Sequence, residues 1–344
     1  MSQTFTLSCV IPGLNESENL QVLLPSLLDE LKALNVNFEI IVVDDGSTDG
    51  TAALLHRFCQ QSPELVYLQL SRNFGKEAAL SAGLARARGN VVVTMDADLQ
   101  HPPQLIAQML KRWHDGVEMV YAVRETRDDE SWLKRWGTRL FYRLMRLSGN
   151  FQMPEDAGDF RLMDRCVVDA LMLLPERNRF MKGLFAWVGF RAEPIIYKPE
   201  QRLHGKSSFK PLRLLHFAID GLTAFTTWPL RLVSLIGVSV SFLSFLYGVF
   251  IILKYAAYGD PVQGWASLIT VVLFFSGINL LSIGILGEYI GRIFGEVKNR
   301  PLYLVRNQLG RGLAENTNLR AQPQVLPNKG PETTQDEGEK SNNN

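Results

Sequence analysis

The sequence predicts an α/β domain with a largely parallel sheet, followed by two membrane-spanning helices. Apolar, β-branched runs alternate with helical periodicity through the first half of the chain, which is typical of βαβ units. Polar clusters follow the carboxyl ends of the expected strands, where such sheets bind ligands. Two charge-free runs in the second half, residues 232–253 and 261–287, are each long enough to cross a hydrocarbon layer of ~30 Å.

The first domain is expected to alternate strands and helices. The expected strands are Thr6–Pro12, Phe38–Val43, Leu65–Leu70, Val91–Met95 and Met119–Val123. The expected helices are Glu18–Leu34, Thr51–Gln60 and Glu77–Arg88, with a further helix that begins near Gln104. Pro25 predicts a kink in the first helix, because proline lacks the N–H that a helix interior needs. Asp49 is a candidate cap for the second helix.

Composition excludes several classes of partner and site. Lys and Arg total 36 against 35 Asp and Glu, so bulk charge predicts no nucleic-acid partner. Cys9, Cys59 and Cys166 are too few and too scattered for a disulfide framework or a zinc site. The first residues show neither the basic region nor the apolar core of a signal peptide, so none is expected. We therefore expect the polar part of the chain in a reducing, cytosolic environment.

Basic residues flank the outer ends of the two apolar runs. They are Arg213, Arg231, Arg292, Lys298 and Arg300. The linker between the runs, residues 254–264, holds a single Lys and a single Asp. The positive-inside rule then predicts a multi-pass protein of the cell inner membrane, with both long ends in the cytoplasm. The competing interpretation is a pair of buried core helices, although soluble cores rarely need two such runs in succession.

These signals divide the chain into segments. Residues 1–207 form a cytoplasmic domain, 208–229 an amphipathic helix beside the membrane, 230–254 and 265–291 the two membrane helices, and 255–264 the external loop. Residues 292–344 form a cytoplasmic tail, which is rich in Asn, Gln, Pro and Glu and is expected to be disordered beyond about residue 307.

Two carboxylates stand at the end of the strand Val91–Met95. Strand alternation puts Asp96 and Asp98 on the same face, and Gln100 adds an amide two residues further on. Two carboxylates on one face repel unless a cation or polar ligand lies between them. The motif therefore indicates a site for a hard divalent metal, Mg²⁺ or Mn²⁺, and its phosphates. The competing interpretation is turn chemistry, in which an Asp before Pro102-Pro103 caps the next helix.

Polar residues at other strand ends extend this site. Asn15 and Glu16 follow the first strand, Asp44 and Asp45 the second, and Arg72–Lys76 the third. The chain shows neither G-x-G-x-x-G after the first strand nor G-x-x-x-x-G-K-[ST], which argues against a dinucleotide oxidoreductase and a P-loop ATPase. A sheet edge with carboxylates suits a metal-bound diphosphate instead. The carboxylates after the second strand can accept hydrogen bonds from a nucleobase or a ribose.

Residues Ser131–Ser148 have the pattern of a helix that lies in the membrane interface. Their sequence, SWLKRWGTRLFYRLMRLS, repeats apolar residues every three or four positions, and carries five cations and no acidic residue. This composition favours anionic headgroups or a lipid phosphate. The competing interpretation is a core-packed helix with a solvated basic side. A second such segment, Phe209–Thr227, leads into the first apolar run.

Four motifs resemble those of glycosyltransferase family 2 with the GT-A (Rossmann-like) fold. They are Val10-Ile-Pro-Gly-Leu-Asn-Glu16, Val42-Val-Asp-Asp-Gly-Ser-Thr-Asp49, Asn73-Phe-Gly-Lys76 and Met95-Asp-Ala-Asp-Leu-Gln-His-Pro102. More narrowly, residues from about 6 to 303 resemble the polyisoprenyl-phosphate glycosyltransferases, which include dolichyl-phosphate mannosyltransferase and bacterial undecaprenyl-phosphate glucosyltransferases. Two positions depart from the family pattern. Leu14 replaces a common aromatic residue, and Ser208 replaces a Lys whose place either Lys206 or Lys210 could take.

The resemblance implies a role for each motif residue. The residues implied to bind the nucleotide-sugar are Pro12, Asn15, Glu16, Asp44, Lys76 and Asp96. The implied catalytic residues are Asp96, Asp98 and Arg124, and the implied metal ligands are Asp98 and Gln100. The residues implied to bind the acceptor phosphate are Lys134, Thr138 and Arg202. We assign no general base, although Asp156 and Asp159 lie in a suitable stretch.

The resemblance also implies an activity. It is the inverting transfer of a hexose from a nucleoside-diphosphate sugar to a polyprenyl phosphate at the cytoplasmic face of the membrane, for use in the cell envelope. UDP-glucose and undecaprenyl phosphate are the expected substrates, and a homo-oligomer, such as a tetramer, is the expected assembly. A phosphate whose second pKa is ~6 is largely dianionic at neutral pH, so its oxygen needs no base to attack the anomeric carbon.

Two alternatives to this activity stay open. One is a glycosyltransferase that acts on another membrane lipid, such as diacylglycerol. The other is a nucleotide-sugar-sensing partner of a lipid flippase, without catalysis of its own. Two helices form a poor transport pathway unless many chains assemble, and the carboxylate set favours chemistry over sensing.

Overall fold

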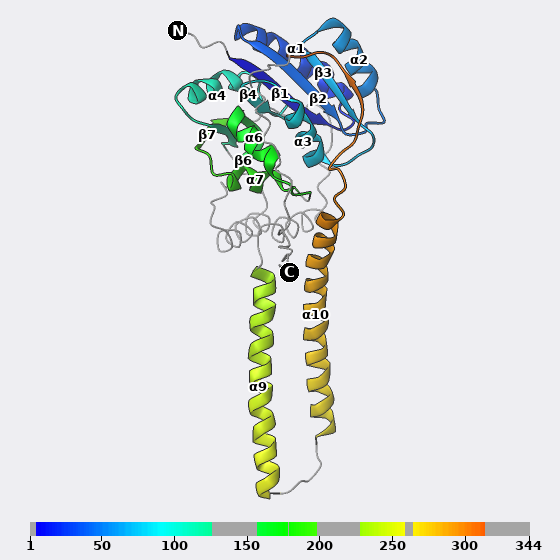
Figure 1. The fold of residues 1–344 in the computed structure, drawn as a ribbon, viewed down its shortest axis with the longest axis vertical. Helices are drawn as coiled ribbons and strands as arrows, with labels where there is room; N and C mark the ends of the chain where they lie inside the picture. The colour runs from blue at the N-terminus through cyan, green and yellow to red at the C-terminus, as the bar shows by residue number, and fades with distance from the viewer. Residues whose placement is uncertain (1–4, 126–156, 178, 198–227, 259–263, 314–344) are drawn as a thin grey trace, which may run out of the picture. The chain divides into compact units, whose positions relative to one another are not determined.

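The computed structural model describes residues 5–125, 157–177, 179–197, 228–258 and 264–313. Its central feature is an 8-stranded sheet in the order β7-β5-β6-β4-β1-β2-β3-β8 (Figure 1). The strands are β1 (Thr6–Gly13), β2 (Asn37–Asp44), β3 (Leu65–Leu70), β4 (Val91–Thr94), β5 (Met119–Arg124), β6 (Ala157–Asp164), β7 (Ala192–Tyr197) and β8 (Val305–Leu309). The helices are α1 (Ser17–Ala33), α2 (Thr51–Gln61), α3 (Lys76–Arg86), α4 (Leu105–His114), α6 (Arg165–Leu173), α7 (Met181–Trp187), α9 (Trp228–Tyr258) and α10 (Trp265–Val297).

The four predicted strands at the centre of the sheet are parallel. β1 pairs with β2 on one side and with β4 on the other, and β2 pairs with β3. Val10 of β1 lies opposite Ile41 of β2 and Thr94 of β4, so these strands end at nearly the same level. Their apolar, β-branched composition suits a sheet that is covered on both faces. The predicted α/β class is confirmed, and the carboxyl ends of these strands meet at one edge.

Alternation along β1 separates two hydrophobic cores. Leu7, Cys9 and Ile11 face one layer, whereas Val10 faces the other. The first core includes the buried faces of α1, α2 and α4, and the second those of α3, α6 and α7. The domain therefore has three layers, with the sheet between two sets of helices (Figure 1).

The sheet is more mixed than the sequence predicted. β6 runs antiparallel between β4 and β5, and neither β6 nor β7 was identified from the sequence. β7 then pairs in parallel with β5, which places Tyr197 opposite Arg124. Local hydrophobic pattern does not encode strand direction, because direction depends on how the chain returns to the sheet.

The tail beyond residue 307 is a second correction. Residues 305–309 form β8, which pairs antiparallel with the edge strand β3, and the Ser71 N–H donates to the Leu304 carbonyl at 2.8 Å. The order continues past the strand, since the Gly312 N–H donates to the Pro63 carbonyl at 3.2 Å. Composition predicted disorder here because a polar segment has no core of its own. The backbone of an exposed sheet edge supplies the partners that the composition cannot show.

A buried carboxylate anchors the end of this tail. Glu39 on β2 is fully buried and accepts hydrogen bonds from the Ser8 hydroxyl at 2.6 Å and the Arg88 N–H at 2.7 Å. It also accepts from the Leu313 N–H at 3.1 Å, and Arg86 lies 3.8 Å from the same carboxylate. A buried charge of this kind is stable only while its hydrogen-bond partners remain in place.

The helices α9 and α10 expose many apolar side chains. Leu235 on α9 is 64% exposed and Leu280 on α10 is 70% exposed. Among the described residues, one segment, Phe274–Val297, is long and apolar enough to cross a membrane. This segment overlaps the second predicted span, whereas the first span remains a prediction.

Several expectations fall on residues outside the described ranges. They are the interfacial helix 131–148, the segment 208–227 with Ser208 and the candidate substitutes Lys206 and Lys210, the acceptor-site residues Lys134, Thr138 and Arg202, and Asp156.

We expect Glu39→Gln to destabilise the sheet domain. An amide can present only one oxygen to the N–H groups of Arg88 and Leu313, so one buried donor would lose its partner at a cost of about 1–3 kcal/mol. The measurement is thermal unfolding of the purified chain. Asp29→Asn, an exposed change on α1, is the control. An unfolding temperature equal to that of the control would contradict the role of Glu39 in anchoring residues 305–313.

Candidate functional site

Polar side chains gather at the edge where β1, β2, β3 and β4 end. Asn15 and Glu16 follow β1, Asp44 ends β2, and Asp96 and Asp98 follow β4. Because β4, β1 and β2 are neighbours in the sheet, the D-x-D segment and the two clusters lie along one edge. This edge has two adjoining parts, one around the D-x-D segment and one around Asp44.

A lysine links the D-x-D motif to a second carboxylate. Lys76, the first residue of α3, places its Nζ 2.7 Å from Asp96 Oδ1 and 2.6 Å from Asp159 Oδ2. Asp159 lies on β6, which was absent from the predicted sheet. Three elements that are distant in sequence therefore converge on one ammonium group.

The charges of this group reinforce one another. Burial favours the neutral amine of Lys76, but Asp159 and Asp96 outweigh it and raise the lysine's pKa. Burial likewise favours the protonated acid of Asp159, but Lys76, followed by Lys182 and Arg161, holds its pKa well below the usual range. The site thus contains an ammonium between two carboxylates, of which Asp159 is ionised at neutral pH.

The D-x-D segment forms a tight turn. Leu99 adopts a left-handed conformation with φ of 62°, and the Gln100 N–H donates to Asp98 Oδ1 at 3.3 Å. The Asp96 N–H donates to His101 Nδ1 at 3.1 Å. A non-glycine residue with positive φ is uncommon, and here the hydrogen bonds on both sides of Leu99 hold the turn.

Arg124 lies beside this turn at the end of β5. Its guanidinium donates a short hydrogen bond to Gln100 Oε1 and also bonds the Tyr197 hydroxyl. The amide oxygen that the sequence analysis assigned to a metal is therefore engaged by Arg124 in this structure. The role of Gln100 as a metal ligand stays a prediction. Its amide oxygen could bind a metal only after Arg124 had released it.

The turn contains side chains that fit a divalent metal. Asp96, Asp98 and His101 each offer one ligand atom, and these atoms lie within 4.8 Å of one another. The two carboxylates supply the hard oxygen donors that Mg²⁺ and Mn²⁺ prefer. Asp98 and Asp96 would hold the ion, and Lys76 already neutralises one oxygen of Asp96.

The second part of the edge surrounds Asp44. This fully buried carboxylate accepts from the Tyr67 hydroxyl at 2.9 Å and from the Ser47 N–H at 2.7 Å. Asn15, with φ of 57°, receives the Thr48 N–H on its side-chain oxygen at 2.8 Å and donates its own N–H to the Ser47 hydroxyl at 2.8 Å. The loops after β1 and β2 are thereby joined.

Asp45 has an internal role that the sequence did not reveal. Its two oxygens accept the N–H groups of Phe74 at 2.7 Å and Gly75 at 2.9 Å. This fixes the loop before α3 and hence the position of Lys76. Asp45 was expected to accept hydrogen bonds from a nucleobase or a ribose, whereas both of its oxygens are already engaged by the protein.

The structure therefore divides the predicted site residues into three sets. The residues brought together around the D-x-D turn are Lys76, Asp96, Asp98, Gln100 and Arg124. The residues at the adjoining strand ends are Pro12, Asn15, Glu16 and Asp44. The acceptor-phosphate residues Lys134, Thr138 and Arg202 lie outside the described ranges.

Three further residues were missed from the sequence. They are Tyr67, His101 and Tyr197. His101 stands inside the quoted motif Met95–Pro102, so that motif carried a signal for it, whereas Asp159 was noted only for its place in a stretch suited to a general base and not as a partner of Lys76. Tyr67 and Tyr197 carried none, because their roles come from strand pairing.

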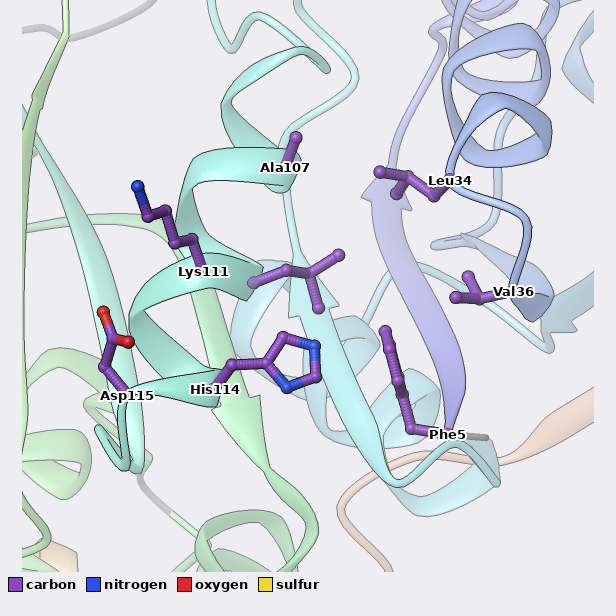
Figure 2. Close-up of a pocket in the computed structure, with 8 residues that line it drawn as sticks. Phe5, Leu34, Val36, Ala107, Lys111, His114 and Asp115 are labelled. Atoms are coloured by element: carbon purple, nitrogen blue, oxygen red, sulfur yellow. The ribbon is translucent and has the colours of Figure 1, made fainter. Parts of the chain in front are cut away.

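A pocket of about 330 Å³ lies away from this edge (Figure 2). It is lined by Phe5, Leu34, Val36, Ala107, Leu110, Lys111, His114 and Asp115. These residues come from the start of β1, the α1–β2 connection and α4, near the amino ends of the strands. None of the predicted site residues contributes to it.

Glu77 predicts a measurable pH dependence of stability. Burial, and then the charge of Asp159, raise its pKa to about 7. Because the folded pKa lies above the unfolded value, the folded chain holds the proton more tightly, and stability falls as pH rises from about 4.5 to 7. The variant Glu77→Gln should lose about 1–3 kcal/mol less of its free energy of unfolding over this pH range than the wild type does. Unfolding temperatures at pH 5 and pH 8 test it, and an equal pH response in both proteins would contradict it.

Comparison with known proteins places this arrangement in a family. The profile of glycosyl transferase family 2 matches residues 8–172, and that of the GtrB C-terminal hairpin matches residues 228–293. An uncharacterized glycosyltransferase of Synechocystis is 45% identical over 307 residues, which cover 89% of this chain and 96% of that protein. The bactoprenol glucosyl transferase of Shigella phage SfII is 42% identical over 302 residues, 87% of this chain and 97% of that protein.

A prophage bactoprenol glucosyl transferase homolog of Escherichia coli is 39% identical over 87% of this chain and 98% of its own length. A solved mannosyltransferase of Pyrobaculum calidifontis aligns with 87% of this chain and 88% of its own at 17% identity, with a TM-score of 0.44. The sequence relatives match nearly their whole length. The chain therefore belongs to glycosyl transferase family 2 and is a glycosyltransferase.

Proposed function

We propose that this enzyme transfers a hexose, with glucose as the first candidate, from a nucleoside-diphosphate sugar to a polyprenyl phosphate. The observation that carries the proposal is the D-x-D turn of Asp96 and Asp98, with Lys76 and Arg124 bound to it. These groups present carboxylates for a metal and cations for phosphates at one sheet edge. Relatives named bactoprenol glucosyl transferases support glucose and a polyprenyl acceptor.

The donor site follows from the adjoining strand ends. Pro12, Asn15, Glu16 and Asp44 would bind the nucleoside, while Asp96 and Lys76 would bind near the diphosphate. A divalent ion on Asp98, joined by Gln100, would neutralise the leaving diphosphate. UDP-glucose is the proposed donor, and Mg²⁺ or Mn²⁺ the proposed ion.

The reaction is a displacement at the anomeric carbon. A phosphate oxygen of the lipid forms a bond to this carbon as its bond to the β-phosphate oxygen breaks, so the nucleoside diphosphate leaves and the configuration inverts. Arg124, with Lys134, Thr138 and Arg202, would hold the acceptor phosphate close to the donor. The residues of this chain serve to align two anions and to neutralise charge.

The charge state of the site favours a phosphate acceptor over a neutral lipid. A hydroxyl such as that of diacylglycerol needs a base to take its proton, whereas a phosphate dianion does not. Asp159, one of the two described carboxylates that contact Lys76, is held ionised by that cation and has a lowered pKa, which makes it a weak base. Diacylglycerol therefore remains the second candidate acceptor.

We also propose an anchor of two membrane helices, with the catalytic domain on the cytoplasmic face and a homo-oligomeric assembly. Support comes from the match of the GtrB C-terminal hairpin to residues 228–293 and from the apolar segment Phe274–Val297. This anchor would bring the site to the level of lipid phosphates.

Asp98→Ala should abolish transfer and its dependence on divalent ions. Membranes that contain the full chain are incubated with a panel of radiolabelled nucleotide-sugars and undecaprenyl phosphate, and the lipid is extracted. We expect label from UDP-glucose in the wild type and at least a hundredfold less in the variant. Asp115→Asn, an exposed change at the end of α4, is the control.

The outcomes separate the candidates. Label in diacylglycerol rather than in the polyprenyl lipid would select the alternative acceptor. Nucleotide-sugar binding without any labelled lipid would favour the sensing partner of a flippase. Turnover near that of the wild type in Asp98→Ala would overturn the metal assignment.

Reversing two charges of the proposed interfacial helix tests acceptor delivery. Arg135→Glu combined with Arg139→Glu should raise the acceptor KM about tenfold or release the domain from vesicles, because the helix would lose its attraction for anionic headgroups. Donor binding should be spared, which equilibrium binding of the nucleotide-sugar measures. Weakened donor binding with an unchanged acceptor KM would show that this helix does not face the lipid.

A further inference from the structure

His101 is the one nitrogen ligand in the described three-residue cluster with Asp96 and Asp98. Proximity alone would make it a metal ligand. Its ring, however, already has a defined hydrogen bond, since Nδ1 accepts the backbone N–H of Asp96 at 3.1 Å. The question is which of the two roles the ring fills.

The ring of His101 is held by its packing. The residue is only 5% exposed, and it stacks on the buried Phe160 with ring centres 4.9 Å apart and planes inclined by 24°. Tyr197 meets it edge-on at 6.1 Å. The packing fixes the plane of the ring. A half-turn within that plane would put a carbon in the place of Nδ1, so the Asp96 N–H would lose its acceptor, and the hydrogen bond therefore favours the observed orientation.

The hydrogen bond determines which nitrogen can carry the proton. A neutral imidazole has one N–H, and a nitrogen that accepts a hydrogen bond does not carry it. With Nδ1 accepting, the proton is on Nε2, and a protonated nitrogen has no lone pair for a metal. Ligation through Nε2 would require either an imidazolate or the loss of the bond to Asp96.

We propose that His101 is a positioning residue, which fixes the D-x-D turn through Nδ1, and that the metal is held by oxygen ligands without the imidazole. The bond from Asp96 N–H to His101 closes the turn around Leu99, whose φ of 62° is unfavourable for a branched apolar residue. This sets the backbone from which both carboxylates project. The inference rests on the proposed metal and donor site.

Two variants distinguish the roles, because each one replaces a different nitrogen of the imidazole with a polar atom in a similar place. The side-chain oxygen of Asn occupies the place of Nδ1, whereas the amide of Gln reaches the place of Nε2. If Nδ1 positions the turn, His101→Asn should bind Mn²⁺ at least tenfold more tightly than His101→Gln. Binding is measured from the electron paramagnetic resonance signal of free Mn²⁺, with the full-length chain in detergent and no sugar donor.

The reverse order would show that Nε2 ligates the metal and would overturn the proposal. Equal binding by the two variants, whether retained or lost, would also overturn it, because the hydrogen bond would then not matter. His114→Asn is the matched control, since His114 lies beside Phe5 at the distant pocket (Figure 2). Its Mn²⁺ affinity should equal that of the wild type.

A spectroscopic test observes His101 in the chain of wild-type sequence. In the chain labelled with ¹⁵N-histidine, the His101 resonances, assigned by their absence in His101→Asn, should show Nε2 protonated and Nδ1 unprotonated. Diamagnetic Mg²⁺ should leave this pattern in place. Loss of the Nε2 proton on Mg²⁺ addition would overturn the proposal.

These results are separable from the proposed function. If Asp98→Ala abolishes Mn²⁺ binding but Asn and Gln at position 101 bind equally, only the role of His101 fails. If the wild type binds no Mn²⁺, the metal assignment fails, and the nitrogen spectrum still tests the bond between His101 and Asp96.

Discussion

The ammonium of Lys76 is the point on which the candidate site depends. It lies 2.7 Å from Asp96 and 2.6 Å from Asp159, and so joins the end of β4 and the start of β6 to the start of α3. Without it, two carboxylates would repel each other beside a third at Asp98. The lysine in turn depends on Asp45, whose two oxygens hold the N–H groups of the preceding loop. The neutralisation of these carboxylates therefore depends on the conformation of the loop that precedes Lys76.

This constraint suits displacement by an anion better than acid–base catalysis. Several described groups around Asp96 are already hydrogen-bonded or ion-paired, as are Arg124 with Gln100 and Lys76 with Asp159. Such a site can align phosphates and stabilise a leaving diphosphate with little reorganisation. Membership of glycosyl transferase family 2 agrees with this chemistry, and a lipid phosphate acceptor fits it without a further group.

Binding and folding share several contacts at this edge. Asp44 is oriented by the hydroxyl of Tyr67, and Asn15 connects two loops through its backbone and side chain. His101 closes the turn that carries the carboxylates. Each of these residues fixes the position of another, so its loss would disturb the loops that carry the proposed binding residues.

The sequence by itself determined the α/β class, the central parallel strands and the edge at which the D-x-D motif lies. These follow from local signals, namely apolar runs, helical periodicity and polar residues at strand ends. Only the tertiary structure decided the antiparallel β6, the order of residues 305–313 and the partners of Lys76, Gln100 and Asp45. The reason is that the type of a side chain shows which hydrogen bonds and ion pairs it can form. Which partner it meets depends on the packing of strands and loops that are distant in sequence.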